Sequence, residues 1–233
     1  MFGAGVQRQA RAVAEQIVRP VAAWGISPNV VSLLGLVFNG VAAGVIAIGQ
    51  LRWGGALVLL AGIFDLFDGA VARTQQRTTR FGAFLDSTLD RYAEGMLFLG
   101  VILSTFRVEH ATSQETWIIA LAYVAALFSL TVSYIRARAE GVGIECKVGL
   151  MERPERVILL GAGLLIGGAS WLLWVLVVLV VTTGFTGVQR IVHVWRQSTN
   201  TTISSPAASS TAAAHSRISH GDRTTPTAEG SSQ

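Results

Sequence analysis

The chain has 233 residues, of which 51% are hydrophobic and only 14% are charged, and its formal net charge is +4. A soluble domain carries about a quarter charged residues, so this composition excludes an ordinary soluble fold and indicates a membrane protein. The single cysteine, Cys146, excludes an intrachain disulfide.

Residues 1–28 are predicted to form a juxtamembrane amphipathic helix on the membrane surface. Between Val6 and Val21, apolar residues recur at helical spacing with arginines between them. This pattern is typical of a helix that lies in the plane of the membrane interface. Gly25 and Pro28 are expected to end this helix before the first membrane span.

Six apolar segments then predict an all-α, polytopic membrane domain with six transmembrane helices over residues 29–196. At about 1.5 Å per residue, each segment can cross a hydrocarbon core of about 30 Å, except the fifth, which is short and glycine-rich. The segments are 29–50, 53–73, 82–106, 116–137, 154–168 and 170–195. The remaining residues, 197–233, are rich in Ser, Thr, Ala and Pro and are expected to form a disordered cytoplasmic tail.

The distribution of basic residues predicts the orientation of these spans. The two ends of the chain and the loops at 73–81 and 136–156 share one side and hold most of the arginines, whereas the opposite loops hold Arg52 and Arg107. By the positive-inside rule, both termini are expected in the cytoplasm of a multi-pass protein of the cell (plasma) membrane. No nucleic-acid motif accompanies this charge, so we expect no nucleic-acid partner.

Four of the five aspartates of the chain lie inside predicted spans. Asp65 and Asp68 are spaced i, i+3 on the second span, and Asp86 and Asp90 are spaced i, i+4 on the third, so each pair shares a helix face. Because the two spans are antiparallel, both pairs are predicted at a similar depth, about 6–12 Å from the cytoplasmic loop.

Carboxylates that converge inside a membrane repel one another, so protons or hard divalent cations have to neutralise them. Oxygen-only ligation favours Mg²⁺, Mn²⁺ or Ca²⁺, and two such ions can clamp a pyrophosphate. The residues alone leave two alternatives open. One is a membrane transporter with an aspartate relay, and the other is a polar network that packs helices together.

The aspartate pattern resembles the motif DxxDGxxAR…GxxxDxxxD of the CDP-alcohol phosphatidyltransferase family. The sequence reads Asp65-Leu-Phe-Asp68-Gly69-Ala-Val-Ala72-Arg73 and, after eight residues, Gly82-Ala-Phe-Leu-Asp86-Ser-Thr-Leu-Asp90. The resemblance extends over residues 10–196. It implies metal-dependent transfer of a phosphatidyl group from CDP-diacylglycerol to an alcohol, with release of CMP, by a homodimer in membrane lipid.

The resemblance also implies roles for individual residues. The four aspartates would ligate two Mg²⁺ ions, with Mn²⁺ as an alternative, and Asp90 would also be the catalytic base. The residues implied in binding CDP-diacylglycerol are Asn29, Val30, Val31, Ser32, Gly69, Arg73 and Thr79. Without the resemblance, Asn29 and Ser32 would be interpreted as helix caps. Glu94, one turn beyond Asp90, is left open between a packing contact and a role in the site.

Three later segments, at 133–140, 152–156 and 188–190, resemble the phosphatidylinositol phosphate synthases of this family. The resemblance implies that the acceptor is inositol 1-phosphate, a phosphorylated polyol, and that a basic pocket binds its phosphate through Arg136, Arg153, Arg156 and Arg190. Arg136 stands where lysine is usual, which keeps the charge and adds a second donor. Glycerol 3-phosphate also carries a phosphate, so phosphatidylglycerophosphate synthase remains the alternative activity.

Overall fold

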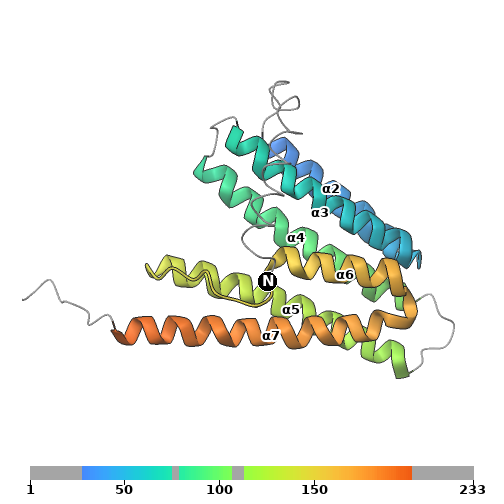
Figure 1. Cartoon of the computed structure of the whole chain (residues 1–233). Helices are drawn as coiled ribbons and strands as arrows, with labels where there is room; N and C mark the ends of the chain where they lie inside the picture. The colour runs from blue at the N-terminus through green and yellow to red at the C-terminus, as the bar shows by residue number, and fades with distance from the viewer. Residues whose placement is uncertain (1–27, 75–78, 107–112, 201–233) are drawn as a thin grey trace, which may run out of the picture. The chain divides into compact units, whose positions relative to one another are not determined.

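The structure is a computed structural model that describes residues 28–74, 79–106 and 113–200; the side chains of Pro28, 64–74 and Asn200 lie outside this description. The described ranges contain six helices and no strand, which confirms the all-α prediction for this part of the chain. The helices, labelled in Figure 1, are α2 (Pro28–Ala47), α3 (Leu51–Thr74), α4 (Arg80–Thr105), α5 (Ser113–Gly141), α6 (Arg153–Gly167) and α7 (Ala169–Asn200). The predicted surface helix and the residues beyond 200 lie outside the described residues.

Each predicted apolar segment corresponds to one of these helices, but only some have the length and composition of a membrane span. Among the described residues, three helices qualify, over Asn29–Ala47, Ser113–Gly141 and Ala169–Thr199, and α3 adds a shorter apolar stretch, Leu51–Ile63. Helix α6 has only 15 residues. The charged residues of α4, among them Asp86, Asp90 and Glu94, lower its apolar character. The last helix also continues to Asn200, beyond the end predicted at 195.

Helix contacts place the site-bearing helices together. Helix α2 packs against both α3 and α4, α3 packs against α6, and α4 packs against α5. The shared core is formed by fully buried aliphatic side chains, which include Ile46, Val58, Val101, Leu164 and Leu176. These contacts belong to the unit that spans Met1–Val194; a second unit, Trp195–Gln233, contains the end of α7.

Helices α2 and α4 approach each other at Gly100. A Cβ atom added there would lie 2.5 Å from the carbonyl oxygen of Ala43, which belongs to the backbone of α2. Backbone atoms cannot move aside like the end of a flexible side chain, so the two helices would have to separate. The glycine therefore permits the close packing of α2 against α4, the two helices that Ser32 and Asp86 also join near their N-terminal ends.

Replacing Gly100 with alanine is expected to destabilise the protein by about 1–3 kcal/mol, because overpacking displaces the backbone of a neighbouring helix. The matched control is Gly95→Ala on the same helix, where an added Cβ would meet nothing within 4 Å. Thermal unfolding of the purified variants in detergent should show a lower midpoint for Gly100→Ala only. Equal midpoints for the two variants would contradict the assigned contact.

Candidate active site

The N-terminal ends of α2 and α4 meet at one point. Thr79 is the N-cap of α4, and its hydroxyl oxygen accepts a hydrogen bond from the Gly82 N–H at 2.9 Å. A Cβ added to Gly82 would lie 3.2 Å from Oδ1 of Asn29, which shows that the start of α2 touches the first turn of α4. Two residues predicted to bind the nucleotide, Asn29 and Thr79, are therefore neighbours.

Ser32 links the first turn of α2 to the first aspartate of α4. Its hydroxyl donates a hydrogen bond to Oδ1 of Asp86 at 3.1 Å. This bond fixes one carboxylate oxygen and leaves the second available to another ligand. Of the other two predicted residues in this stretch, Val30 is exposed and Val31 is partly exposed.

The second half of the predicted aspartate cluster is described only in part. Asp65, Asp68, Gly69 and Arg73 belong to the final turns of α3, but their side chains lie outside the described residues. Within the described ranges, no group of three or more His, Cys, Asp or Glu side chains is placed to hold a metal. The convergence of all four aspartates therefore stays a prediction.

The donors that are described fit a hard divalent cation. Asp86 is exposed and Asp90 is partly exposed, and they lie one turn apart on α4, where they present carboxylate oxygens and no nitrogen or sulfur ligand. Oxygen-only ligation of this kind suits Mg²⁺ or Mn²⁺.

A cavity of about 580 Å³ opens beside Asp90, between α4, α5 and the start of α6. All four arginines predicted to bind the acceptor phosphate line it, together with Arg91. Four carboxylates line it as well, namely those of Asp90, Glu94, Glu140 and Glu152. The cavity thus joins the predicted catalytic base to the predicted phosphate-binding residues.

A buried ion pair forms one wall of this cavity. Arg156 donates from Nε to Oε1 of Glu94 at 2.7 Å and from Nη2 to Oε2 at 3.0 Å, and the two side chains are only 2% and 7% exposed. The third nitrogen, Nη1, donates to the carbonyl oxygen of Met151 at 3.2 Å. Glu94 therefore makes a buried polar contact between α4 and α6 and also lines the cavity, while its role in the site stays a prediction.

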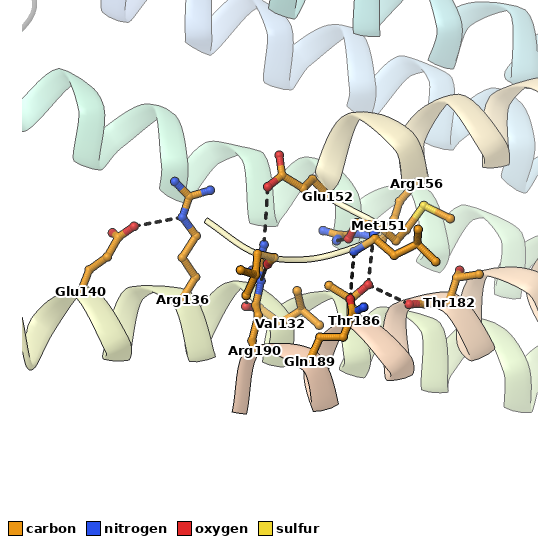
Figure 2. A network of polar contacts seen from close by, with 12 residues as sticks. Val132, Arg136, Glu140, Met151, Glu152, Arg156, Thr182, Thr186, Gln189 and Arg190 are labelled. Carbon is orange, nitrogen blue, oxygen red and sulfur yellow. Dashed lines mark hydrogen bonds and ion pairs between the residues drawn. The ribbon is translucent and has the colours of Figure 1, made fainter. Parts of the chain in front are cut away.

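Arg190 is also buried, and its guanidinium connects three segments. It donates from Nε to the Val148 carbonyl and from Nη1 to the Val132 carbonyl, both at 2.8 Å. Its Nη2 lies 3.9 Å from Oε1 of Glu152, a contact drawn in Figure 2. An arginine inside α7 therefore joins α5 to the loop that leads into α6.

The other two predicted arginines are more accessible. Arg136 donates from Nε to Oε1 of Glu140 at 3.0 Å, as drawn in Figure 2. The side chain of Arg136 is 38% exposed. Arg153 places Nη1 3.1 Å from Oδ1 of Asp90, which brings a guanidinium directly to the predicted base. Each of the four arginines thus has a carboxylate partner within this cavity wall.

Sequence reasoning did not identify Glu140 and Glu152 as partners of these arginines. Glu140 follows Arg136 at i+4, so helical spacing could have found it. Glu152 and Arg190 are far apart in sequence, and no local pattern connects them.

The loop between α5 and α6 also holds Glu145, whose carboxyl is exposed. The pKa of this carboxyl is lowered, first by a hydrogen bond from Lys147 and then by the charge of that lysine.

Comparison with known proteins shows that the chain resembles a described family. The sequence model described as CDP-alcohol phosphatidyltransferase matches residues 25–185. The archaetidylinositol phosphate synthase of Methanothermobacter thermautotrophicus is 38% identical over 193 residues, which cover 81% of this chain and 94% of that protein.

Two crystal structures of the Mycobacterium tuberculosis phosphatidylinositol phosphate synthase resemble this fold. The structure with bound CDP-DAG has a TM-score of 0.70 and 31% identity, and the match covers 79% of this chain and 94% of that chain. The structure in complex with manganese and citrate has a TM-score of 0.70 and 32% identity, with coverage of 78% and 88%.

Proposed function

This chain belongs to the CDP-alcohol phosphatidyltransferase family, and we propose that it transfers a phosphatidyl group from CDP-diacylglycerol to inositol 1-phosphate. The family makes the chain a transferase of phospholipid biosynthesis, and its apolar helices indicate a membrane protein. In the proposed reaction the acceptor oxygen forms a bond to the phosphatidyl phosphorus, the bond from that phosphorus to CMP breaks, and the products are phosphatidylinositol phosphate and CMP.

The observation that carries the proposal is the cavity that joins Asp90 to the arginines. Arginines outnumber carboxylates by one among its lining residues, so an empty cavity is basic and a phosphate dianion is attracted to it. Arg136 and Arg153 are the accessible donors, while Arg156 and Arg190 are held in place by their buried contacts. Guanidinium groups bind phosphate through short, charge-assisted hydrogen bonds.

In this proposal Asp65, Asp68, Asp86 and Asp90 hold two Mg²⁺ ions, with Mn²⁺ as an alternative. When bound, these ions neutralise the diphosphate of the nucleotide substrate. Ser32 orients Asp86 through its hydrogen bond. Asp90 accepts the proton of the attacking hydroxyl, and Arg153 beside it brings the acceptor within reach of that carboxylate.

The nucleotide is proposed to bind where α2 and α4 meet, through Asn29, Val30, Val31, Ser32, Gly69, Arg73 and Thr79. The contacts of Asn29 and Ser32 with the first two turns of α4 support this position. We also propose six spans with both termini in the cytoplasm, and a homodimer in the cell membrane. The long apolar helices α2, α5 and α7 support the membrane placement.

Competition between acceptors tests the proposed substrate. Inositol 1-phosphate, glycerol 3-phosphate, free inositol and serine are offered together to the purified protein with labelled CDP-diacylglycerol. Phosphatidylinositol phosphate should be the main lipid product, and free inositol should be used about 10² times less efficiently, because it lacks two charge-assisted hydrogen bonds of about 1.5 kcal/mol or more each.

The other products of this competition have distinct meanings. Phosphatidylglycerophosphate as the main product would support phosphate binding by the cavity. It would also identify glycerol 3-phosphate, and not inositol 1-phosphate, as the acceptor. A main product from free inositol or serine would contradict the role of the arginines in phosphate binding.

A further inference from the structure

The loop between α5 and α6 crosses one face of α7 (Figure 2). It then leads into α6, whose first residues line the cavity. We refer to residues 148–152 of this loop as the strap. The strap is followed directly by Arg153 and Arg156, which line the cavity. Contacts that fix the position of the strap therefore also fix the backbone position of these two arginines at the start of α6.

Three side chains on consecutive turns of α7 hold the backbone of the strap. The Leu150 N–H donates to Oε1 of Gln189 at 3.1 Å, and the Met151 N–H donates to Oγ1 of Thr186 at 3.0 Å. Arg190 donates from Nε to the carbonyl of Val148 at 2.8 Å. The strap forms no regular secondary structure, so these side chains supply the partners that a helix or sheet would otherwise provide.

Gly149 allows the strap to lie this close to α7. Its φ is +149°, a conformation that favours glycine, and an added Cβ would lie 2.7 Å from Cγ2 of Thr186. Thr186 therefore contacts the strap twice, through its methyl group below Gly149 and through its hydroxyl at Met151.

Hydrogen bonds connect the strap to the arginines of the cavity. Met151 is held on both sides of its backbone, because its N–H donates to Thr186 while its carbonyl accepts from Nη1 of Arg156 at 3.2 Å. Arg156 in turn binds Glu94, one turn beyond Asp90 on α4. A continuous series of hydrogen bonds thus runs from α7 to the helix that carries the predicted base.

We propose that Thr186 and Gln189 are positioning residues for acceptor binding, because they hold the strap in the register that directs Arg153 and Arg156 into the cavity. Neither residue lines the cavity, so neither is a catalytic residue. The effect on acceptor binding rests on the proposed function above, whereas the effect on the strap itself does not.

Cys146 provides a readout of the strap that needs no substrate. It is the only cysteine, it lies in the same loop, and it is fully buried. Thr186→Val and Gln189→Met keep the size of the side chain. Each removes the side-chain oxygen that accepts a hydrogen bond from a backbone N–H of the strap. Such a loss favours local opening by about tenfold or more, so both variants should react with a maleimide about tenfold faster than the unchanged protein.

Two further variants separate the strap from general destabilisation. Thr182→Val removes a hydroxyl one turn earlier on α7 that bonds only to carbonyls of its own helix, so its labelling rate should stay unchanged. Thr186→Ser keeps the hydroxyl, so Cys146 should remain largely protected from reaction with the maleimide. Unchanged labelling in Thr186→Val and Gln189→Met, or equally fast labelling in Thr182→Val, would overturn the anchoring.

Kinetics then test the positioning role. In Thr186→Val and Gln189→Met, the KM for inositol 1-phosphate should rise about tenfold, as expected for one lost hydrogen bond to a charged group. The KM for CDP-diacylglycerol and kcat at saturating acceptor should stay unchanged. Faster labelling without a change in the acceptor KM would overturn the positioning role. If none of the tested acceptors reacts even with the unchanged protein, the proposed function fails, while the labelling rates still decide whether α7 anchors the strap.

Discussion

Replacing Asp86 or Asp90 with asparagine is expected to lower the rate of transfer by about 10³-fold or more, with the protein still inserted and folded. Asparagine preserves the shape of the side chain and can still accept a hydrogen bond, such as that from Ser32 to position 86. It removes the negative charge that is proposed to bind a divalent cation and, at position 90, the basic carboxylate oxygen that is proposed to take the acceptor proton. The same loss is expected for Asp65→Asn and Asp68→Asn if the four aspartates act as one site.

The chain offers a matched control for this series. Asp222→Asn removes the fifth aspartate, which lies outside the range matched by the family, residues 25–185, so its rate should equal that of the unchanged protein. The effects of Asp86→Asn and Asp90→Asn should not add in the double variant, because either one alone disables the same site. Near-normal rates in any two of the four single variants would contradict a shared metal site.

Replacing Arg156 with methionine is expected to have the second-largest effect, and mainly on stability. The change leaves the carboxylate of Glu94 uncompensated in a site where the two side chains are 7% and 2% exposed. Removing one partner of a buried ion pair costs about 3–5 kcal/mol. The thermal unfolding midpoint in detergent should therefore fall sharply, whereas Arg138→Met, on the exposed surface of α5 and outside the cavity lining, should leave it unchanged.

A double variant separates the structural and functional roles of Arg156. Glu94→Leu combined with Arg156→Met removes both charges, and apolar replacement of a buried pair is often neutral or stabilising. Its unfolding midpoint should recover, but its KM for inositol 1-phosphate should remain about tenfold higher because the proposed phosphate ligand, Arg156, is still missing. Recovery of the acceptor KM together with stability would limit Arg156 to a structural role.

The helices could be predicted because apolar runs and their interruptions are local features of sequence. All the predicted spans correspond to helices, including the short fifth one, because each is bounded by turn or charged residues. The end of α7 was predicted too early. The prediction placed it where the apolar run ends, but the hydrogen-bonded helix continues through polar residues to Asn200.

Part of the site could be predicted for the same reason. The spacing of Asp86 and Asp90 places them on one face of α4 from sequence alone. Resemblance to the family selected four arginines, and the structure brings all four to one cavity. The strap could not be predicted, because Met151 and Thr186 are 35 residues apart and their contact depends on how α5, α6 and α7 pack.

We propose that this chain is a phosphatidyltransferase for a phosphorylated acceptor, and the release of CMP can be measured to test this proposal. Purified protein is incubated with CDP-diacylglycerol and Mg²⁺, with and without inositol 1-phosphate, and CMP and lipid product are measured together. We predict that CMP forms in equal amount to phosphatidylinositol phosphate, only when the acceptor is present, and that a chelator stops it reversibly. Absence of CMP under these conditions, from folded protein and with each of the tested acceptors, would contradict the account.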